Sequence, residues 1–294
     1  MKVPDARPFF VAAVVVLSVC VPAFGMEWPL PGAGMTRNFG FNDGGRPVAG
    51  VELSGGGSVL AAASGEVIFD FSPAGGYSGF QSPLGAWTAV DHGNGIVGIY
   101  ARHGGRGEAG PSRVSVDEGT PLAAAGVSGR SRGEGVFFML YDRRERRWVN
   151  PAMIAPPLAD TIPPQIRGVR LVADGGNPAG IDLRQGTSRG RHVIAVDAAD
   201  LLSGGGGAVL APHRIVASVN GTEVGNLVFE MMSAREGETF VGRGSRVRAR
   251  RVYSHFPAFE VGEAMLNSGQ AILEIIVRDI AGNSASVTHR ISVE

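Results

Sequence analysis

The sequence predicts an all-β protein with two domains, and three observations carry this prediction. Short apolar or alternating stretches recur along the chain and are separated by turn signals. Glycine accounts for 45 of the 294 residues, which is about twice its usual share. No stretch shows a long helical period. The length allows two domains that each bury a core.

Residues 1–25 have the pattern of a signal peptide and are set aside from the fold. A basic start precedes the apolar run Phe9–Val21, and Ala23–Gly25 then supplies small residues where a signal peptidase reads. The run is too short to span a bilayer, and nothing later resembles a transmembrane helix. We therefore expect an exported protein of the periplasm or cell envelope. Lipid anchoring through Cys20 is disfavoured, because Val19 stands where a small residue is usual.

Composition excludes several classes of chemistry. Cys20 is the only cysteine, so the mature chain is expected to have no disulfide, no thiolate metal ligand and no cysteine nucleophile. The formal net charge is zero, which implies no bulk attraction to nucleic acid or to an anionic membrane.

The first domain is expected over residues 26–157. Short strands alternate there with glycine-rich turns, and the predicted strand regions are residues 49–53, 58–71, 86–101 and 135–142. The last of these regions, GVFFMLYD, is an unbroken apolar strand that follows a Gly/Ser-rich turn.

A proline-rich seam separates the two halves. Five prolines fall between Pro151 and Pro164, a density that favours extended chain and opposes regular strand pairing. Longer strands with clear alternation follow, at residues 191–198, 213–221, 271–279 and 285–294. About seven strands in this length are typical of an immunoglobulin-like β-sandwich, predicted for residues 158–294. The closing segment 277–293 resembles the last hairpin of bacterial immunoglobulin-like envelope modules.

Four further patterns are weak signals. Gly105–Gly110 fits GxGxxG, but Pro111 follows it and no helix begins there. The four glycines 204–207 lack the Lys-Ser/Thr of a phosphate loop. The carboxylates Asp197 and Asp200 are calcium candidates, although turn capping is the commoner role of such residues. Three alternating arginines are expected to share one solvated strand face rather than to bind an anion: Arg246, Arg248 and Arg250.

Five ordered segments of the first domain resemble the lysostaphin/LytM family of zinc peptidoglycan endopeptidases. They are EWPLPG with MTRNFGFNDGGR, AGVELSGGGSVLAAASGEVIF, VDHGNGIVGIYA, VSGRSRGEGVFFML and WVNP. The resemblance covers roughly residues 27–155 and implies a compact all-β core, a twisted antiparallel sheet over a groove. It also implies the family's chemistry, in which a zinc ion held by about three ligands activates a water molecule.

The residues that this resemblance places at the metal site differ from those of the family. The His and Asp of its HxxxD motif correspond to Val48 and Glu52. The His of its YAH segment corresponds to Arg102, and the two histidines of HxH correspond to Gly135 and Phe137. Only Glu52 can touch a metal, so the resemblance implies no catalytic residue, no bound metal and no other cofactor.

Two histidines lie near the groove in the sequence. Adjacent side chains on a strand point to opposite faces, so His103 is expected to point away from the groove unless the register slips. His92 corresponds to a turn residue of the family and not to a ligand. Phe137 and Met139 share a strand face with Gly135 and are expected to fill the former metal cleft.

We therefore expect a catalytically inactive, LytM-like protein. Family members that lack the metal ligands resemble regulators that bind and activate cell-wall amidases, so a cell-wall hydrolase or another envelope protein is the expected partner. The candidate binding residues are Phe137, Met139, Arg102 and His103, with Glu52 on the rim. Two alternatives stay open: a non-enzymatic module that binds peptidoglycan or has a structural role, and an atypical active endopeptidase.

Overall fold

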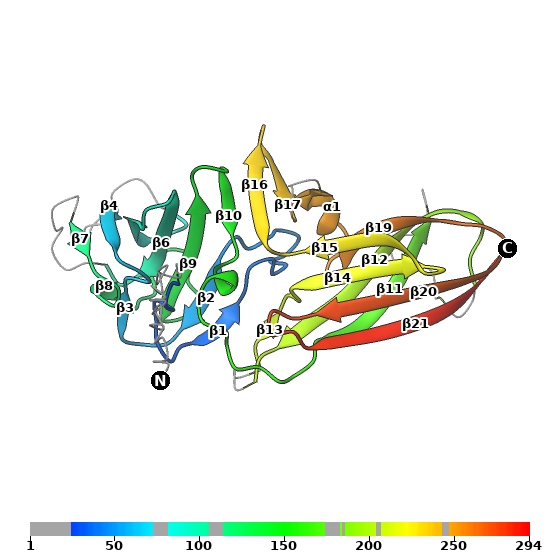
Figure 1. Ribbon diagram of the computed structural model, residues 1–294, viewed down its shortest axis with the longest axis horizontal. Coiled ribbons are helices and arrows are strands. Elements are labelled where there is room, and N and C mark those ends of the chain that lie inside the picture. The colour runs from blue at the N-terminus through cyan, green and yellow to red at the C-terminus, as the bar shows by residue number, and fades with distance from the viewer. Residues whose placement is uncertain are drawn as a thin grey trace, which may run out of the picture.

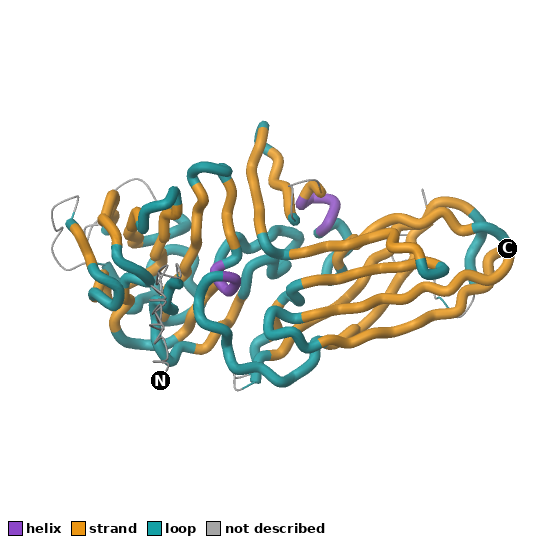
Figure 2. Tube along the Cα trace, in the orientation of Figure 1, coloured by secondary structure: helices purple, strands orange, loops and turns teal. Residues whose placement is uncertain are grey.

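The computed structural model describes residues 25–72, 82–105, 114–173, 183, 186–203, 207–242 and 247–294 (Figure 1). Strands dominate these residues, whose helical elements are the 3-10 turn η1 (Pro151–Met153) and the helix α1 (Ala249–Val252) (Figure 2). The all-β fold class predicted from the sequence is confirmed. None of the described helices is long and apolar enough to cross a membrane. The predicted signal peptide, most of the GxGxxG and GGGG segments and Arg246 lie outside the described residues.

The first half forms most of an 11-stranded sheet. Its strands are β1 (Gly34–Arg37), β2 (Val51–Ser54), β4 (Gly65–Phe71), β5 (Ala86–Asp91), β6 (Ile96–His103), β7 (Ser115–Val116), β9 (Gly135–Asp142) and β10 (Arg147–Val149). Two further strands, β3 (Ser58–Leu60) and β8 (Pro121–Ala124), pair with each other in a small second sheet.

Strand β9, whose bounds match the apolar run predicted from the sequence, is the centre of this half. It pairs with β6 along one edge, and with β2 and then β10 along the other. Side chains on a strand alternate between its two faces. Val136, Phe138 and Leu140 enter the main core of the first half, whereas Phe137 and Met139 enter a smaller cluster on the opposite face. Burial on both faces explains why the segment shows no polar alternation.

The second half contributes an eight-stranded sheet. Its strands are β11 (Gln165–Ala173), β12 (Gly190–Leu201), β13 (Val209–Leu210), β14 (Arg214–Val219), β15 (Thr222–Val228), β19 (Phe259–Leu266), β20 (Gly269–Arg278) and β21 (Ser284–Val293). β15 and β19 pair at Gly225 and Gly262, where an added Cβ would lie 2.5 and 2.3 Å from the backbone of the facing strand. Figure 1 shows the sheet as two layers, and both pack on one core that includes Ile194, Ile215 and Leu273. The immunoglobulin-like topology stays a prediction.

A hairpin of the second half joins the sheet of the first half. Strands β16 (Met231–Arg235), β17 (Glu238–Val241) and β18 (Val247–Arg248) extend this sheet, because β16 pairs with β10 across Arg147–Val149. The expected domain boundary at residue 157 therefore does not separate the two sheets. The sequence interpretation missed this because strand pairing between distant segments leaves no local signal.

Polar contacts and side-chain packing reinforce the junction. The side chain of Asn38 makes two hydrogen bonds with the backbone of Ala211, at 2.7 and 2.8 Å. The hydroxyl of Tyr253 donates to the carbonyl of Gly40 at 2.7 Å. Phe39 of the first half belongs to the same buried cluster as Phe229 and Met232 of the second half. The halves therefore share a core, which their sequence patterns did not indicate.

The arginine strip expected on one strand face has a different structure. Arg248 ends β18, and Arg250 lies in α1, so the two residues do not share a strand. Both side chains nevertheless approach the carboxylate of Glu238, at 3.9 and 3.3 Å. The alternation of arginines was misleading because the chain turns into a helix after a strand of two residues.

Candidate functional site

The five positions matched to the family's metal site come together in one groove. Val48 lies in the loop between β1 and β2, and Glu52 lies on β2. Arg102 is near the end of β6, and Gly135 and Phe137 begin β9. Glu52 is directly opposite Phe137 in the β2–β9 register, and Ala101 is opposite Phe137 in the β6–β9 register. The first half thus brings these residues together, and Val48 faces them from a loop and not, as expected, from a strand.

The apolar floor of the groove is closed. Val48, Ala101, Phe137 and Met139 form one buried cluster, and Phe137 and Met139 are only 7% and 6% exposed. Phe41, Leu84, Trp87, Ile99 and Trp148 pack over this cluster and are partly buried. Phe137 and Met139 therefore offer little surface to a partner. Any docking has to use the residues above them, which the sequence interpretation did not single out.

Gly135 leaves no room for a side chain. A Cβ built on this residue would lie 2.0 Å from the carbonyl oxygen of Leu53, which belongs to the paired strand β2. Contacts shorter than about 3 Å are essentially never made by real Cβ atoms. The resemblance matches Gly135 to the first histidine of HxH. The backbone of β2 leaves no space there for a side chain of any kind, so no residue at this position could serve as a metal ligand.

An ion-pair network centred on the buried Glu52 fills the polar end of the groove. Glu52 is 7% exposed and lies between two guanidinium groups, with Arg37 Nε 3.4 Å from Oε2 and Arg102 Nη1 3.3 Å from Oε1. Arg37 also reaches Asp43 at 3.5 Å, and Asp43 pairs with the exposed Arg132 at 3.1 Å. Arg37 was not predicted from the sequence as part of the groove. The pairing of β1 with β2 sets Arg37 opposite Glu52, and this pairing has no local sequence signal.

A β-bulge aims Arg102 at the groove. The β5–β6 register skips this residue, since Trp87 pairs with Ala101 and Ala86 pairs with His103. Arg102 takes a left-handed backbone conformation with φ of 65°, a strained state for a residue that is not glycine. Its guanidinium lies over the Phe137 ring, 4.4 Å from the centroid, which is favourable cation–π geometry. Burial lowers the pKa of Arg102, and the charge of Glu52 opposes this shift.

The two histidines of the first half, His92 and His103, contact polar groups of the surrounding fold and stabilise it. His103 is fully buried, its Nε2 lies 3.2 Å from the hydroxyl of Thr88, and its Nδ1 accepts the N–H of Gly105. The bulge at Arg102 turns His103 away from the groove, so His103 offers no surface to a partner, contrary to its expected place among the binding residues. His92 Nε2 lies 3.1 Å from the hydroxyl of Tyr100, and burial lowers the pKa of His92.

The residues of the groove do not fit a catalytic zinc ion. A zinc site needs about three nitrogen, sulfur or carboxylate ligands with one open position. Among the described residues of the groove, Glu52 is the carboxylate at a matched ligand position, and it is already paired with two arginines. Two positive charges at this distance would repel a dication. Among the described residues, the positions matched to the family's ligands therefore do not assemble the ligand set of a zinc site.

We predict that the purified protein carries no stoichiometric zinc, and that Phe137→His gains none. A single imidazole among Val48, Ala101 and Met139 would lack partner ligands, and its unpaired burial should destabilise the fold by about 1–3 kcal/mol. Elemental analysis after purification without chelator measures the metal, and urea unfolding measures the stability. One zinc per chain in either protein would show that a site had been overlooked.

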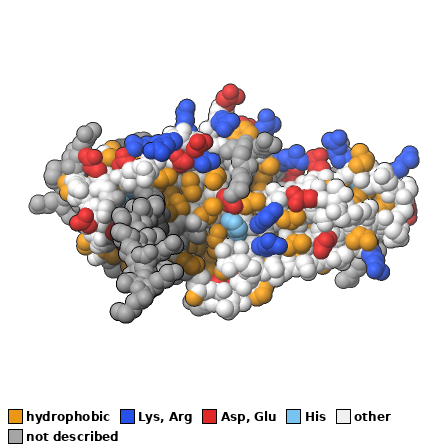
Figure 3. Space-filling model, in the orientation of Figure 1, with side chains coloured by type: hydrophobic (Ala, Val, Ile, Leu, Met, Phe, Trp, Pro, Cys, Tyr) orange, Lys and Arg blue, Asp and Glu red, His pale blue; other side chains and the backbone are white. Residues whose placement is uncertain are grey.

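A small cavity opens at the polar end of the groove. Its volume is about 220 Å³, and its lining includes Arg37, Glu52, Arg102 and the turn residues Ser131–Glu134. Arg37 Nη2 and Arg102 Nε are buried there without a hydrogen-bond partner in the described structure. On the opposite side of the groove floor, Trp87 stacks on Phe69 with 4.4 Å between ring centroids, and Phe69 is 44% exposed. In Figure 3, charged side chains gather along one edge of the molecule, and apolar side chains are visible near its middle.

Solved structures similar to this chain include M23 peptidases. Csd3 of Helicobacter pylori is 21% identical with a TM-score of 0.36, over 48% of this chain and 35% of Csd3. The catalytic domain of the prophage-encoded M23 protein EnpA from Enterococcus faecalis is 22% identical with a TM-score of 0.35, over 44% of this chain and 95% of that domain. The antimicrobial peptidase lysostaphin from Staphylococcus simulans is 14% identical with a TM-score of 0.36, over 77% and 90%.

The chain thus spans only about a third of the length of Csd3. A protein-family model matches residues 163–294, which is most of the second half. No curated protein matches the chain. The likeness to the LytM family rests on the five ordered segments of the sequence and on the places that they take around β9, rather than on these superpositions.

Proposed function

We propose that this chain is an exported LytM-like envelope protein without peptidase activity, whose groove binds another protein. The favoured class of partner is a cell-wall hydrolase that the chain regulates. One observation carries the proposal: two positions matched to the family's metal site, Glu52 and Arg102, are joined with Arg37 in an ion-pair network, in which Arg37 and Glu52 are buried and Arg102 is partly buried. A network of this kind orders the groove without supplying chemistry.

The intact frame of the groove supports a binding role. The left-handed conformation of the bulged Arg102 costs of order 1–3 kcal/mol. A protein that had only lost its catalysis would have no reason to keep such a strained residue. In this protein the bulge directs the guanidinium onto Phe137 and Glu52. Strained residues held by their surroundings cluster at ligand sites and switch regions. The bulge therefore fits a groove that is kept in one shape for a partner.

The rim residues are the proposed contacts. Arg132 has a side chain that is 69% exposed beside the cavity, and its Asp43 partner is 43% exposed. Trp87 and the exposed Phe69 form an aromatic pair on the other side of the groove. Aromatic residues and arginines are enriched among the residues that dominate binding energy at interfaces. The combination of an aromatic anchor with a charged rim is the usual anatomy of a protein-binding site.

A non-enzymatic peptidoglycan-binding module is the second candidate. The stacked Trp87 and Phe69 favour it, because an exposed aromatic face can also pack on flat apolar ligand surfaces. The two candidates differ in what is retained: a regulator needs a protein partner, whereas a wall-binding module sediments with purified sacculi that contain no protein. Affinity capture from envelope extract, run beside sacculus sedimentation, distinguishes them.

We predict that Arg132→Glu weakens binding of the captured partner by about tenfold, whereas Arg250→Glu changes it by less than about twofold. Charge reversal at the centre of an interface typically costs about 1–2 kcal/mol, and peripheral charges cost less. Arg250 is the matched control, since it is a similarly exposed arginine outside the groove. Arg102→Glu is unsuitable, because it would bury two carboxylates against each other.

Titration of the partner against both variants, at two salt concentrations, measures this difference. A greater loss with Arg250→Glu than with Arg132→Glu would place the working surface around α1 and overturn the groove proposal. Sedimentation of the protein with bare sacculi, without any captured protein, would favour the second candidate.

A further inference from the structure

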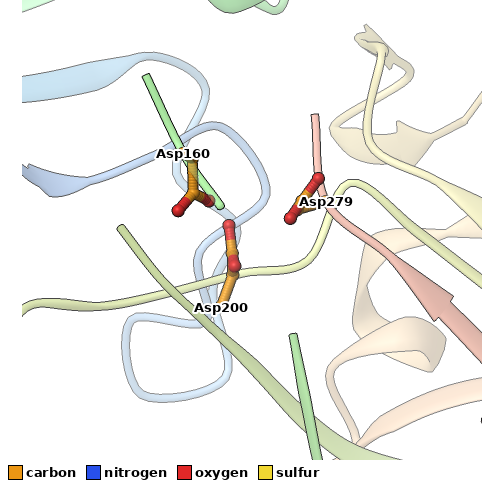
Figure 4. Close-up of side chains that lie close together, drawn as sticks. All are labelled: Asp160, Asp200 and Asp279. Carbon is orange, nitrogen blue, oxygen red and sulfur yellow. The ribbon is translucent and has the colours of Figure 1, made fainter. Parts of the chain in front are cut away.

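Three aspartates from separate segments converge beside the proline-rich seam. Asp160 lies within the seam, Asp200 near the end of β12, and Asp279 just after β20. One carboxylate oxygen from each lies within 4.8 Å of the other two. Figure 4 shows the three side chains directed toward a common point. This cluster is outside the groove, and it plays no part in the function proposed above.

The polar partners of the cluster are all neutral. Asp160 Oδ1 accepts the backbone N–H and the hydroxyl of Ser203, at 3.0 and 2.9 Å. Asp279 accepts hydrogen bonds from the backbone of Gly282 and from the backbone and side chain of Asn283. None of the ion pairs in the described part of the chain includes one of these carboxylates. His213 senses the charge of Asp279, but burial lowers the pKa of this imidazole and so favours its neutral form.

Two of these side chains show features, beyond their proximity, that favour a cation ligand. The Oδ2 atom of Asp160 is buried and has no hydrogen-bond partner in the described structure. Asp200 is only 3% exposed, and its carboxylate accepts one hydrogen bond, at Oδ1 from the N–H of the adjacent Leu201. A buried carboxylate without a compensating charge is costly.

The ligand chemistry favours a hard dication. All the side-chain donors are carboxylate oxygens, with no nitrogen or sulfur ligand in the cluster, which argues against zinc. Calcium takes six to eight oxygen ligands in flexible geometry and tolerates carboxylates of mixed denticity, whereas magnesium demands a near-ideal octahedron. Three carboxylates from three separate segments suit calcium better, with water completing the shell.

We propose that Asp160, Asp200 and Asp279 form a calcium site that fastens the proline-rich seam to the second half of the protein. The existing contacts show what the ion would reinforce. Asn283 Nδ2 donates to the carbonyl of Asp160 at 3.3 Å, and Thr161 N–H donates to the hydroxyl of Ser203 at 3.0 Å. Calcium would add a bond from the seam to β12 and to the β20–β21 turn. The seam would then be held more firmly to the second half when calcium is present, in addition to the core that the two halves already share.

The test uses the mature full-length chain, stripped with chelator and then titrated with calcium chloride. We expect about one calcium per chain with a dissociation constant on the order of 0.1–1 mM, as in extracellular modules. At ten times that concentration, Tm should rise by about 3–5 °C. Limited proteolysis between residues 156 and 164 should slow by about fivefold or more. Magnesium chloride at the same concentration should give a smaller shift in Tm.

Variants make the assignment specific. Asp200→Asn and Asp279→Asn should each weaken calcium binding at least tenfold and abolish the calcium-dependent rise in Tm. Asp197→Asn is the matched control: Asp197 lies on the same strand but pairs with Arg167 at 2.7 Å, outside the cluster. Without calcium, Asp200→Asn should melt no lower than the unmodified chain, since it removes like-charge repulsion. That result also shows that the variant folds.

Two outcomes would overturn the proposal. The first is a chelator-stripped chain that binds neither calcium nor magnesium at 10 mM, a concentration roughly tenfold above the weakest expected dissociation constant. The second is an equal calcium-dependent rise in Tm in Asp200→Asn, Asp279→Asn and Asp197→Asn, which would reveal non-specific binding to surface carboxylates.

Discussion

Replacing Gly135 with alanine is expected to destabilise the protein by about 3 kcal/mol or more. The added methyl carbon would stand 2.0 Å from the carbonyl oxygen of Leu53 and 3.1 Å from the Cα of Ser54. Both obstacles belong to the backbone of β2, which cannot move aside without breaking its pairing with β9. Overpacking of a well-packed core costs about 1–3 kcal/mol and occasionally more, and a rigid backbone neighbour places this case at the upper end.

Gly133→Ala is the matched control for this experiment. Gly133 lies two residues before Gly135, in the segment that leads into β9, and a Cβ built on it meets nothing within 4 Å. We expect a change of less than about 0.5 kcal/mol for this variant. Urea unfolding followed by circular dichroism measures both proteins. Similar stabilities for the two variants would mean that β2 can shift, and that the family's ligand position is open to a side chain after all.

Phe229→Ala is expected to destabilise both halves of the molecule together, by about 3–5 kcal/mol. Phe229 is fully buried at the junction and packs on Phe259 with 5.3 Å between ring centroids. A Cβ added to Gly40 of the first half would lie 2.5 Å from the Phe229 ring, so the ring contacts that backbone closely. Its own carbonyl accepts a hydrogen bond from the side chain of Asn150 at 2.9 Å. A cavity at this point weakens a core that both halves share.

Calorimetry of the unmodified chain should accordingly show one transition, and Phe229→Ala should shift that whole transition to lower temperature. Phe256→Ala is the control, because Phe256 lies near the same junction but is 59% exposed; its Tm should change by only about 1–2 °C. Two separate transitions, with only the one assigned to the second half shifted, would contradict a shared core. That result would restore the independent domains expected from the seam.

The sequence by itself determined the parts of this protein that depend on local patterns. Strand alternation and glycine punctuation predicted the all-β class, and an unbroken apolar run after a Gly/Ser-rich turn predicted the strand Gly135–Asp142 with its correct bounds. Ordered motifs identified the LytM-like frame, whereas the expected absence of a metal from the groove stays a prediction. These features were accessible because side-chain periodicity and ligand chemistry are written residue by residue.

Tertiary structure decided everything that depends on which distant segments meet. The hairpin at residues 231–241 shows ordinary strand signals, and only its pairing with β10 merges the two halves. Arg37 became part of the groove through the β1–β2 register, and Gly135 was closed by the backbone of Leu53. The sequence suggested Asp197 and Asp200 as a pair of calcium candidates. In the structure, Asp200 lies instead beside Asp160 and Asp279. Long-range pairing and burial set these contacts, and neither has a local signature in the chain.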